Sequence, residues 1–315
     1  MTKERMIAAI DHITGFTDDT ENARIQHPFS VIGPAGNDKD VLRIYAYGGC
    51  VGKLKGGNGH CELLDRDYFN NHGEAFSAEE KAIAEKWIGD SKSSKGTITG
   101  TWCDEVVDSS IYLKMSLKAL KSKFQKTNGD DKERNLQMEI LSRFLKGNPG
   151  WCIVDVETGI TKKILPDSSI IENVKKPDFV VFDKRRKQFG IIEMKAFNDN
   201  TDNLYEHYSL FDEIYMNPGP FIDEMRHRAT IMAEYGLIEQ DDFNTDSLVW
   251  FGFLFVKGGI DGSRELIEKY MPRNGDGEWN VRKDCRFLYV EDVKDLNKKG
   301  LAFEEMSGIE GFMSK

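Results

Sequence analysis

Two acidic residues and one lysine in the middle of the chain have a spacing that could form a catalytic or metal-binding site. Asp178 begins the apolar run 178–183, and the next apolar run, 189–197, contains Glu193 and Lys195. Side chains alternate between the two faces of a strand, so Glu193 and Lys195 are expected on the same face. A hairpin pairing of the two runs places Asp178 opposite the neighbourhood of Glu193. The spacing therefore predicts two carboxylates and an amine close together.

This combination of groups is suited to metal-dependent chemistry. Two converging carboxylates repel each other unless a cation lies between them. Mg²⁺ prefers oxygen ligands and shares its remaining positions with water and substrate phosphate. Such an ion lowers the pKa of a bound water, while Lys195 orients that water or stabilises the transition state. We therefore expect hydrolysis of phosphodiesters, with Asp178 and Glu193 as metal ligands. The alternative is an exposed Glu193–Lys195 ion pair of little energetic value.

The segments Pro177-Asp178 and Glu193-Met194-Lys195 resemble the signature of the PD-(D/E)XK nuclease superfamily, which includes restriction and repair enzymes. The resemblance covers mainly residues 131–256 and implies a restriction-endonuclease-like mixed β-sheet flanked by helices. It also implies that the acidic residues bind Mg²⁺ or Mn²⁺ and that the lysine assists the attacking water. A weaker resemblance, through residues 131–146 and the following Asn148-Pro149, is to nuclease domains of the Shedu anti-phage defence type.

The superfamily resemblance implies a further acidic residue from the helix before the sheet, and this helix offers Glu133 and Glu139. On a helical wheel the apolar stripe is centred near Gln137, with Glu133 one turn before it and Glu139 on the opposite side. Glu133 is therefore expected as a third catalytic and metal-binding carboxylate, and Gln137 as a neighbour that contacts substrate. The alternative is that Glu133 only favours the N-terminus of the helix.

Basic residues are candidates for contact with the substrate backbone. Lys184 and Arg185 lie in the turn between the two strands, although such turns are commonly polar because water covers them. Arg226 lies near the apolar face of a predicted helix, where it either faces the cleft or extends to solvent. Arg228 on the same helix is expected to be more exposed. No histidine has HExxH or paired zinc spacing, so the histidines, including His207, are expected to be structural or surface residues.

Apolar periodicity and turn residues predict the elements that position these groups. Glycine-rich turns separate short apolar runs in 31–64, and Ser77 with Glu80 has the spacing of a capping box. The polar break at 127–131 marks the expected domain boundary. After it we expect a helix, three strands, and then a helix, a strand, a helix and a strand, at 132–146, 152–156, 179–183, 189–197, 220–235, 248–256, 263–270 and 286–290.

This order of elements predicts an α/β or α+β fold with two domains. Residues 1–128 are expected to form a smaller α+β recognition or regulatory domain. Residues 129–315 are expected to form the nuclease domain, with a mixed β-sheet flanked by helices.

Composition limits the partners and the compartment. The formal net charge of −10 argues against a surface given over to nucleic acid, so contacts with DNA must be local. The five scattered cysteines, without a CxxC pair, indicate reduced thiols. No apolar run has the length of a membrane span, and the start lacks the apolar stretch of a secretory signal. We expect a cytoplasmic protein without a membrane partner.

Together these features predict a Mg²⁺-dependent DNA endonuclease. By analogy with the superfamily, it would act in bacterial restriction or antiviral defence. A homo-oligomer or a protein partner could form through the N-terminal domain, and RNA is a less favoured substrate than DNA. The alternative is a catalytically silent nuclease-fold protein that binds nucleic acid or a protein partner.

Overall fold

A computed structural model describes 3–18, 27–34, 41–46, 49–55, 60–63, 76–82, 98–101, 113–118, 120–121, 137, 140–141, 150–159, 164, 176–196, 204–245, 250–256, 259–282, 285–290 and 304–314. The chain divides into two compact units. The first unit comprises Met1–Ser142 and Ile231–Leu237, and the second comprises Arg143–Thr230 and Ile238–Lys315. The boundary predicted between residues 128 and 129 falls within 122–136, outside the described residues, and stays a prediction.

The first unit contains an antiparallel sheet with the strand order β1–β2–β3–β4–β5. Its elements in the described residues include α1 (Lys3–Gly15), β1 (Ser30–Pro34), β2 (Val41–Ala46), β3 (Gly49–Lys55), β4 (His60–Leu63) and β5 (Ile98–Thr101). Helical residues also occur at 78–82, 113–118 and 120–121. The strands expected in 31–64 are thus confirmed in this unit.

The predicted capping box is present at the start of the helical segment 78–82. The backbone N–H of Ser77 donates to a Glu80 carboxylate oxygen at 2.8 Å, and the Glu80 N–H donates to the Ser77 hydroxyl at 3.2 Å. These reciprocal bonds satisfy two amide groups that the first turn of a helix leaves without intrahelical acceptors.

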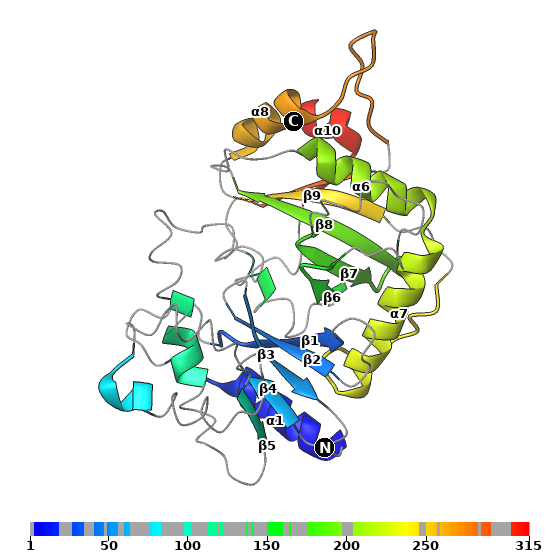
Figure 1. The fold of residues 1–315 in the computed structure, drawn as a ribbon. Coiled ribbons are helices and arrows are strands. Elements are labelled where there is room, and N and C mark those ends of the chain that lie inside the picture. Colours follow the sequence, from blue (N-terminus) through cyan, green and yellow to red (C-terminus); the bar gives the residue numbers. More distant parts are fainter. Residues whose placement is uncertain are drawn as a thin grey trace. The chain divides into compact units, whose positions relative to one another are not determined.

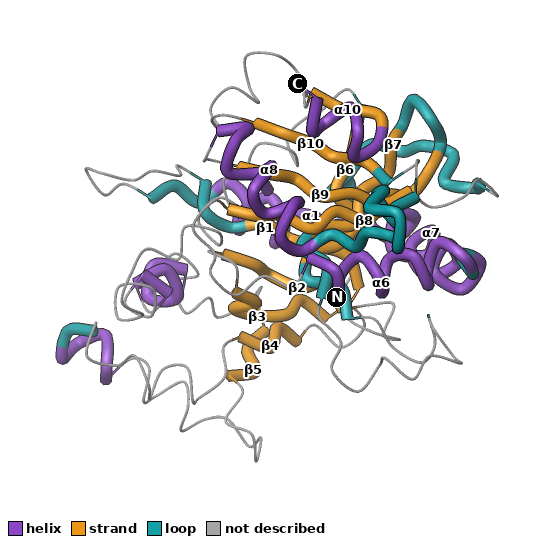
Figure 2. Tube along the Cα trace, turned by 90° about the horizontal axis from the view of Figure 1, so that it is seen from above, coloured by secondary structure: helices purple, strands orange, loops and turns teal. Residues whose placement is uncertain are grey.

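The second unit is built on a six-stranded mixed sheet with the order β11–β10–β9–β8–β7–β6. Figure 2 shows its successive strands β10, β9 and β8 side by side. Strands β6, β7 and β8 pair antiparallel, β8 and β9 pair parallel, as do β9 and β10, and β11 is antiparallel to β10. The strands are β6 (Trp151–Val156), β7 (Phe179–Asp183), β8 (Gln188–Ala196), β9 (Trp250–Val256), β10 (Arg286–Val290) and β11 (Glu304–Ser307).

Two helices connect the parallel strands β8 and β9, and the second of them ends in residues that belong to the first unit. These are α6 (Leu204–Met216) and α7 (Gly219–Glu234), and they are followed by α8 (Gly259–Tyr270) and α10 (Gly308–Ser314). Parallel neighbours require such a crossover, whereas β7 and β8 are joined by a short turn. The predicted strands and the helices near 220–235 and 263–270 are confirmed, but α6, β11 and α10 were not expected.

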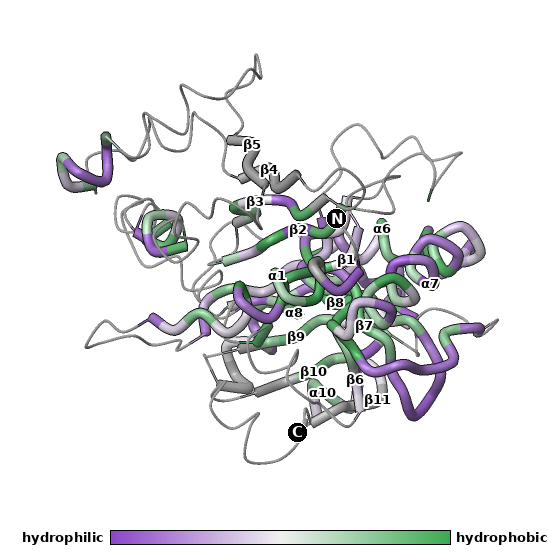
Figure 3. Tube along the Cα trace, turned by 90° about the horizontal axis from the view of Figure 1, so that it is seen from below, coloured by the Kyte–Doolittle hydropathy of each residue, from purple (hydrophilic) through white to green (hydrophobic). Residues whose placement is uncertain are grey.

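Phenylalanine side chains form the core on one face of this sheet. Phe211 of α6 lies 6.0 Å from Phe251 and 6.2 Å from Phe253, between ring centroids. Phe312 of α10 lies 5.5 Å from Phe255. Figure 1 shows α6 lying along β8 and β9, and Figure 3 shows β9 in the green of apolar residues. Burying each such side chain contributes roughly 1.5–3 kcal/mol, which fixes α6 on this face.

The register of β8 against β9 decides which β8 residues face α6. Glu193 pairs with Phe253 and Lys195 with Phe255, and paired residues of neighbouring strands point to the same face. Glu193 and Lys195 therefore lie on the face that α6 covers. Gly190, on the other face, pairs with Trp250, and a Cβ added to Gly190 would lie 2.2 Å from the indole ring. Glycine at 190 thus makes room for this tryptophan.

Candidate active site

Glu193 and Lys195 form a buried ion pair on the central strand β8. The Lys195 ammonium lies 2.8 Å from Glu193 Oε1, and the two residues are 3% and 4% exposed. The predicted same-face arrangement is confirmed, and the alternative of an exposed pair is wrong. Burying two charges costs free energy that their attraction alone seldom recovers, so such a pair needs a reason beyond stability.

Asp178 approaches the same place from the strand next to β8. The last register pair of the hairpin joins Phe179 to Ile192, so Asp178 lies one position beyond it, opposite Glu193. The Asp178 carboxylate accepts a hydrogen bond from the backbone N–H of Met194 at 2.7 Å. The side chain therefore extends across the end of the hairpin toward β8.

The pKa of Asp178 reflects its burial and the charge of the Glu193 carboxylate. Burial raises the pKa of Asp178 well above its ordinary value, and repulsion from Glu193 raises it further. The hydrogen bond from Met194 and the charge of Lys195 act in the opposite direction but do not cancel these effects. Glu157, whose backbone N–H donates to the Asp178 carbonyl at 3.1 Å, adds to the repulsion. A cation at this place would remove the penalty for ionising Asp178.

His207 lies in the site, although its sequence context did not predict this place. His207, from the first half of α6, has its Nδ1 3.1 Å from Glu193 Oε2 and is 5% exposed. His207 belongs to no metal-binding motif, so the residue type alone did not indicate a role in the site. The apolar spacing of Leu204, Tyr208 and Phe211 predicts a helix with one buried face, and that pattern could have identified α6.

The donor set fits a hard divalent ion only in part. Among the residues that the structure describes, no group of three or more His, Cys, Asp or Glu side chains is arranged to hold a metal. Asp178 and Glu193 supply two carboxylates, and Mg²⁺ is commonly held by one or two carboxylates together with waters and substrate phosphate. The chemistry of the two carboxylates therefore fits Mg²⁺ or Mn²⁺ as a ligand pair that solvent and substrate complete.

The expected third carboxylate cannot be followed in the same way. Glu133 and the competing Glu139 lie outside the described residues. Gln137 is helical and 2% exposed, and it belongs to the first unit. Its expected contact with substrate stays a prediction, as do the roles of the two glutamates.

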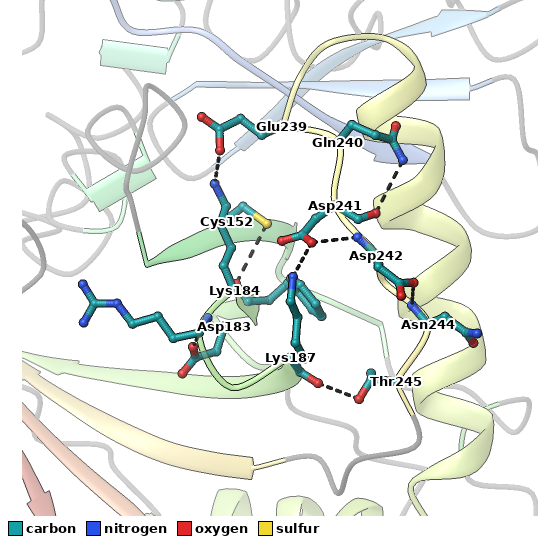
Figure 4. A network of polar contacts seen from close by, with 12 residues as sticks. Cys152, Asp183, Lys184, Lys187, Glu239, Gln240, Asp241, Asp242, Asn244 and Thr245 are labelled. Atoms are coloured by element: carbon teal, nitrogen blue, oxygen red, sulfur yellow. Dashed lines mark hydrogen bonds and ion pairs between the residues drawn. The ribbon is translucent and has the colours of Figure 1, made fainter.

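The cations of the β7–β8 turn are engaged by acidic residues that follow α7. Lys184 Nζ lies 2.6 Å from Glu239, and Lys187 forms an ion pair with Asp241, as Figure 4 shows. Arg185 is exposed. Contact of Lys184 with a substrate phosphate would have to replace its pair with Glu239. The expected substrate-binding roles of Lys184 and Arg185 stay predictions.

Helix α7 contributes a second buried network, which corrects one expectation. Arg228 is 6% exposed, so the prediction that it is an exposed residue is wrong. Its guanidinium forms ion pairs with Asp155 of β6 and with Glu224, the latter at 3.0 Å. Arg226, by contrast, is half-buried and donates to the Thr245 carbonyl at 3.1 Å. The charge of Arg228 is buried because two carboxylates meet it there.

None of the helices in the described ranges combines the length and the apolar character that crossing a bilayer requires. No protein-family model matches the chain, and neither a curated protein nor a solved structure matches it.

Proposed function

We propose that this chain is a metal-dependent phosphodiesterase of the PD-(D/E)XK type, acting on DNA. The observation that carries the proposal is the buried Glu193–Lys195 pair with the Asp178 carboxylate reaching toward it from the adjoining strand. The antiparallel β6–β7–β8 segment, followed by a helical crossover to the parallel strand β9, supports a restriction-endonuclease-like fold for the second unit.

Asp178, Glu193 and Lys195 would have different roles in hydrolysis. Asp178 and Glu193 would hold Mg²⁺ or Mn²⁺, which when bound lowers the pKa of a water and neutralises charge on the phosphate oxygens. Lys195, held beside Glu193, orients the attacking water or donates to the oxygen on which charge develops. The raised pKa of Asp178 supports this assignment, because the metal-free site holds more negative charge than burial favours.

A second function is favoured by the partners of Glu193. Its Oε1 faces Lys195 and its Oε2 faces His207, so the carboxylate already has two basic neighbours without a metal. A catalytically silent protein of this fold, which binds nucleic acid or a protein partner, would keep such a neutralised cluster as a structural element. The acidic net charge of −10 favours a protein partner for that function.

Cleavage assays with matched variants separate the two functions. Plasmid, linear and single-stranded DNA, and RNA, are incubated with the full chain and Mg²⁺ or Mn²⁺, or with EDTA. Asp178→Asn and Lys195→Met are expected to abolish divalent-dependent cleavage while the protein remains folded. Asp183→Asn is the control, because Asp183 is also buried on β7 but caps the turn through the backbone N–H groups of Arg185 and Arg186.

The outcomes assign the function directly. Cleavage by the wild type and by Asp183→Asn, but not by the two site variants, supports the nuclease. Absence of metal-dependent cleavage of all four substrates by the wild type, or equal cleavage by all variants, contradicts it. Cleavage of RNA alone would change the substrate class. Recognition or oligomerisation by the first unit, and a role in bacterial antiviral defence, remain further parts of the proposal.

A further inference from the structure

The imidazole of His207 reaches the site from a different element than the other groups. Glu193 and Lys195 come from β8, whereas His207 comes from α6, which packs on the same face. The His207 ring also meets Phe211 edge-on, with 6.0 Å between centroids. Because Phe211 is anchored against the β9 phenylalanines, the ring is held on that side by packing.

The two oxygens of Glu193 face different basic side chains. Lys195 Nζ is 2.8 Å from Oε1, and His207 Nδ1 is 3.1 Å from Oε2. One such neighbour would leave the carboxylate able to rotate about its Cγ–Cδ bond. The contact at Oε1 is a hydrogen bond from Lys195, whereas the His207 imidazole approaches Oε2 within ion-pair distance but without hydrogen-bond geometry. Together these two neighbours, which come from different elements, limit the rotation of the carboxylate.

We infer that His207 is a positioning residue, which holds Glu193 in the orientation that metal binding requires. An ionised carboxylate can only accept hydrogen bonds, so the imidazole must carry a proton on Nδ1 to interact favourably with it. Partners that orient a metal-ligating carboxylate typically change metal affinity or activity by about 10–100-fold when they are removed. The inference rests on the proposed function where it concerns the metal.

The contact through Nδ1 allows a sharp choice of variants. The side-chain amide of asparagine is attached at Cγ, as Nδ1 is in histidine, so His207→Asn keeps a donor near the same place. The amide nitrogen of glutamine lies one atom further out, and His207→Leu keeps the volume without a donor. His227→Leu is the control, because His227 is a half-buried histidine on α7.

Calorimetric titration measures the dissociation constant for Mn²⁺ in each variant, and cleavage at saturating Mn²⁺ measures its activity. His207→Leu is expected to raise the dissociation constant for Mn²⁺ by about 10–100-fold. His207→Asn should retain most of the wild-type affinity, His207→Gln should not, and His227→Leu should behave as wild type. In a Glu193→Gln background, the change of His207 to leucine should have no further effect, because the residue through which it acts is gone. Equal affinities for His207→Leu and wild type, or equal losses for the leucine and asparagine variants, overturn the inference.

A metal-free measurement separates this inference from the proposed function. The ¹⁵N resonances of the His207 ring report which nitrogen carries the proton, and we expect Nδ1 protonation that Glu193→Gln alters. Unchanged ring resonances in Glu193→Gln would show that His207 does not hold this carboxylate, whatever the protein does with metal. A wild type that neither binds Mn²⁺ nor cleaves nucleic acid would instead overturn the proposed function, and the ring resonances would still decide the contact.

Discussion

Replacing Arg228 with methionine is expected to destabilise the second unit by about 3–5 kcal/mol, the usual cost of breaking a buried ion pair from one side. Asp155 and Glu224, its two partners, are 0% and 5% exposed. Methionine keeps most of the length of the arginine stem, so the variant removes the charge with little change in packing. The buried carboxylates of Asp155 and Glu224 would then have lost the cation that pairs with both of them.

The structure supplies a control on the same helix and a partial rescue. Arg226 is half-buried, pairs with Asp223, whose side chain is 74% exposed, and donates to the Thr245 carbonyl, so Arg226→Met should cost only about 1–2 kcal/mol. Adding Glu224→Leu to Arg228→Met should recover part of the loss. Asp155 keeps hydrogen bonds from the Val156 N–H and the Thr158 hydroxyl, both at 2.9 Å, so the recovery should be substantial.

Urea unfolding followed by far-UV circular dichroism and tryptophan fluorescence measures these differences. The midpoint for Arg228→Met should lie well below those of the wild type and Arg226→Met, with the double variant between them. Equal midpoints for the two single variants would show that the Arg228 charge is not held by buried partners.

Three further predictions follow from other parts of the second unit. Gly190→Ala should lower the thermal midpoint by an amount that corresponds to at least about 1–3 kcal/mol, because its Cβ would overlap the Trp250 ring. In the absence of metal, Asp178→Asn should be more stable than wild type at neutral pH, and chemical unfolding at several pH values should show the difference vanishing in acid. The raised folded-state pKa makes the contribution of Asp178 to stability fully present in acid and lost as the pH rises through that pKa. Burial raises the pKa of the Cys152 thiol to about 12, so peptide mapping after alkylation of the native protein at pH 8 should find Cys152 unmodified.

Each of these three predictions has its own control experiment. Gly219→Ala meets nothing within 4 Å, so it should not lower the thermal midpoint. Added Mn²⁺ should reverse the order of stability of wild type and Asp178→Asn, and an unchanged order would contradict metal binding there. Cys50 is exposed and should be alkylated under conditions that spare Cys152. Alkylation of Cys152 at the rate of Cys50 would contradict the burial of β6.

The parts of the site that could be predicted from sequence are those fixed by local rules. Strand alternation placed Glu193 and Lys195 on one face, and the short turn set a register that brings Asp178 opposite Glu193. The apolar residues around them indicated a central, buried strand. All of these features depend on residues that are close together in the sequence.

The parts that could not be predicted depend on contacts between distant segments. Arg228 is buried because Asp155, 73 positions earlier, meets its charge, and no helical periodicity records such a partner. Lys184 pairs with Glu239, which follows it by 55 positions. His207 enters the site only because the phenylalanines of β9 hold α6 against the sheet. Glu133 lies outside the described residues, so its predicted role stays a prediction.

Anomalous diffraction from crystals of the full chain soaked with Mn²⁺ tests the proposed chemistry most directly. We predict one manganese peak that carboxylate oxygens from both Asp178 and Glu193 coordinate. The peak should be absent from crystals of Asp178→Asn. Manganese bound only at surface carboxylates, with the ion pair of Glu193 and Lys195 undisturbed, would contradict a metal site between Asp178 and Glu193.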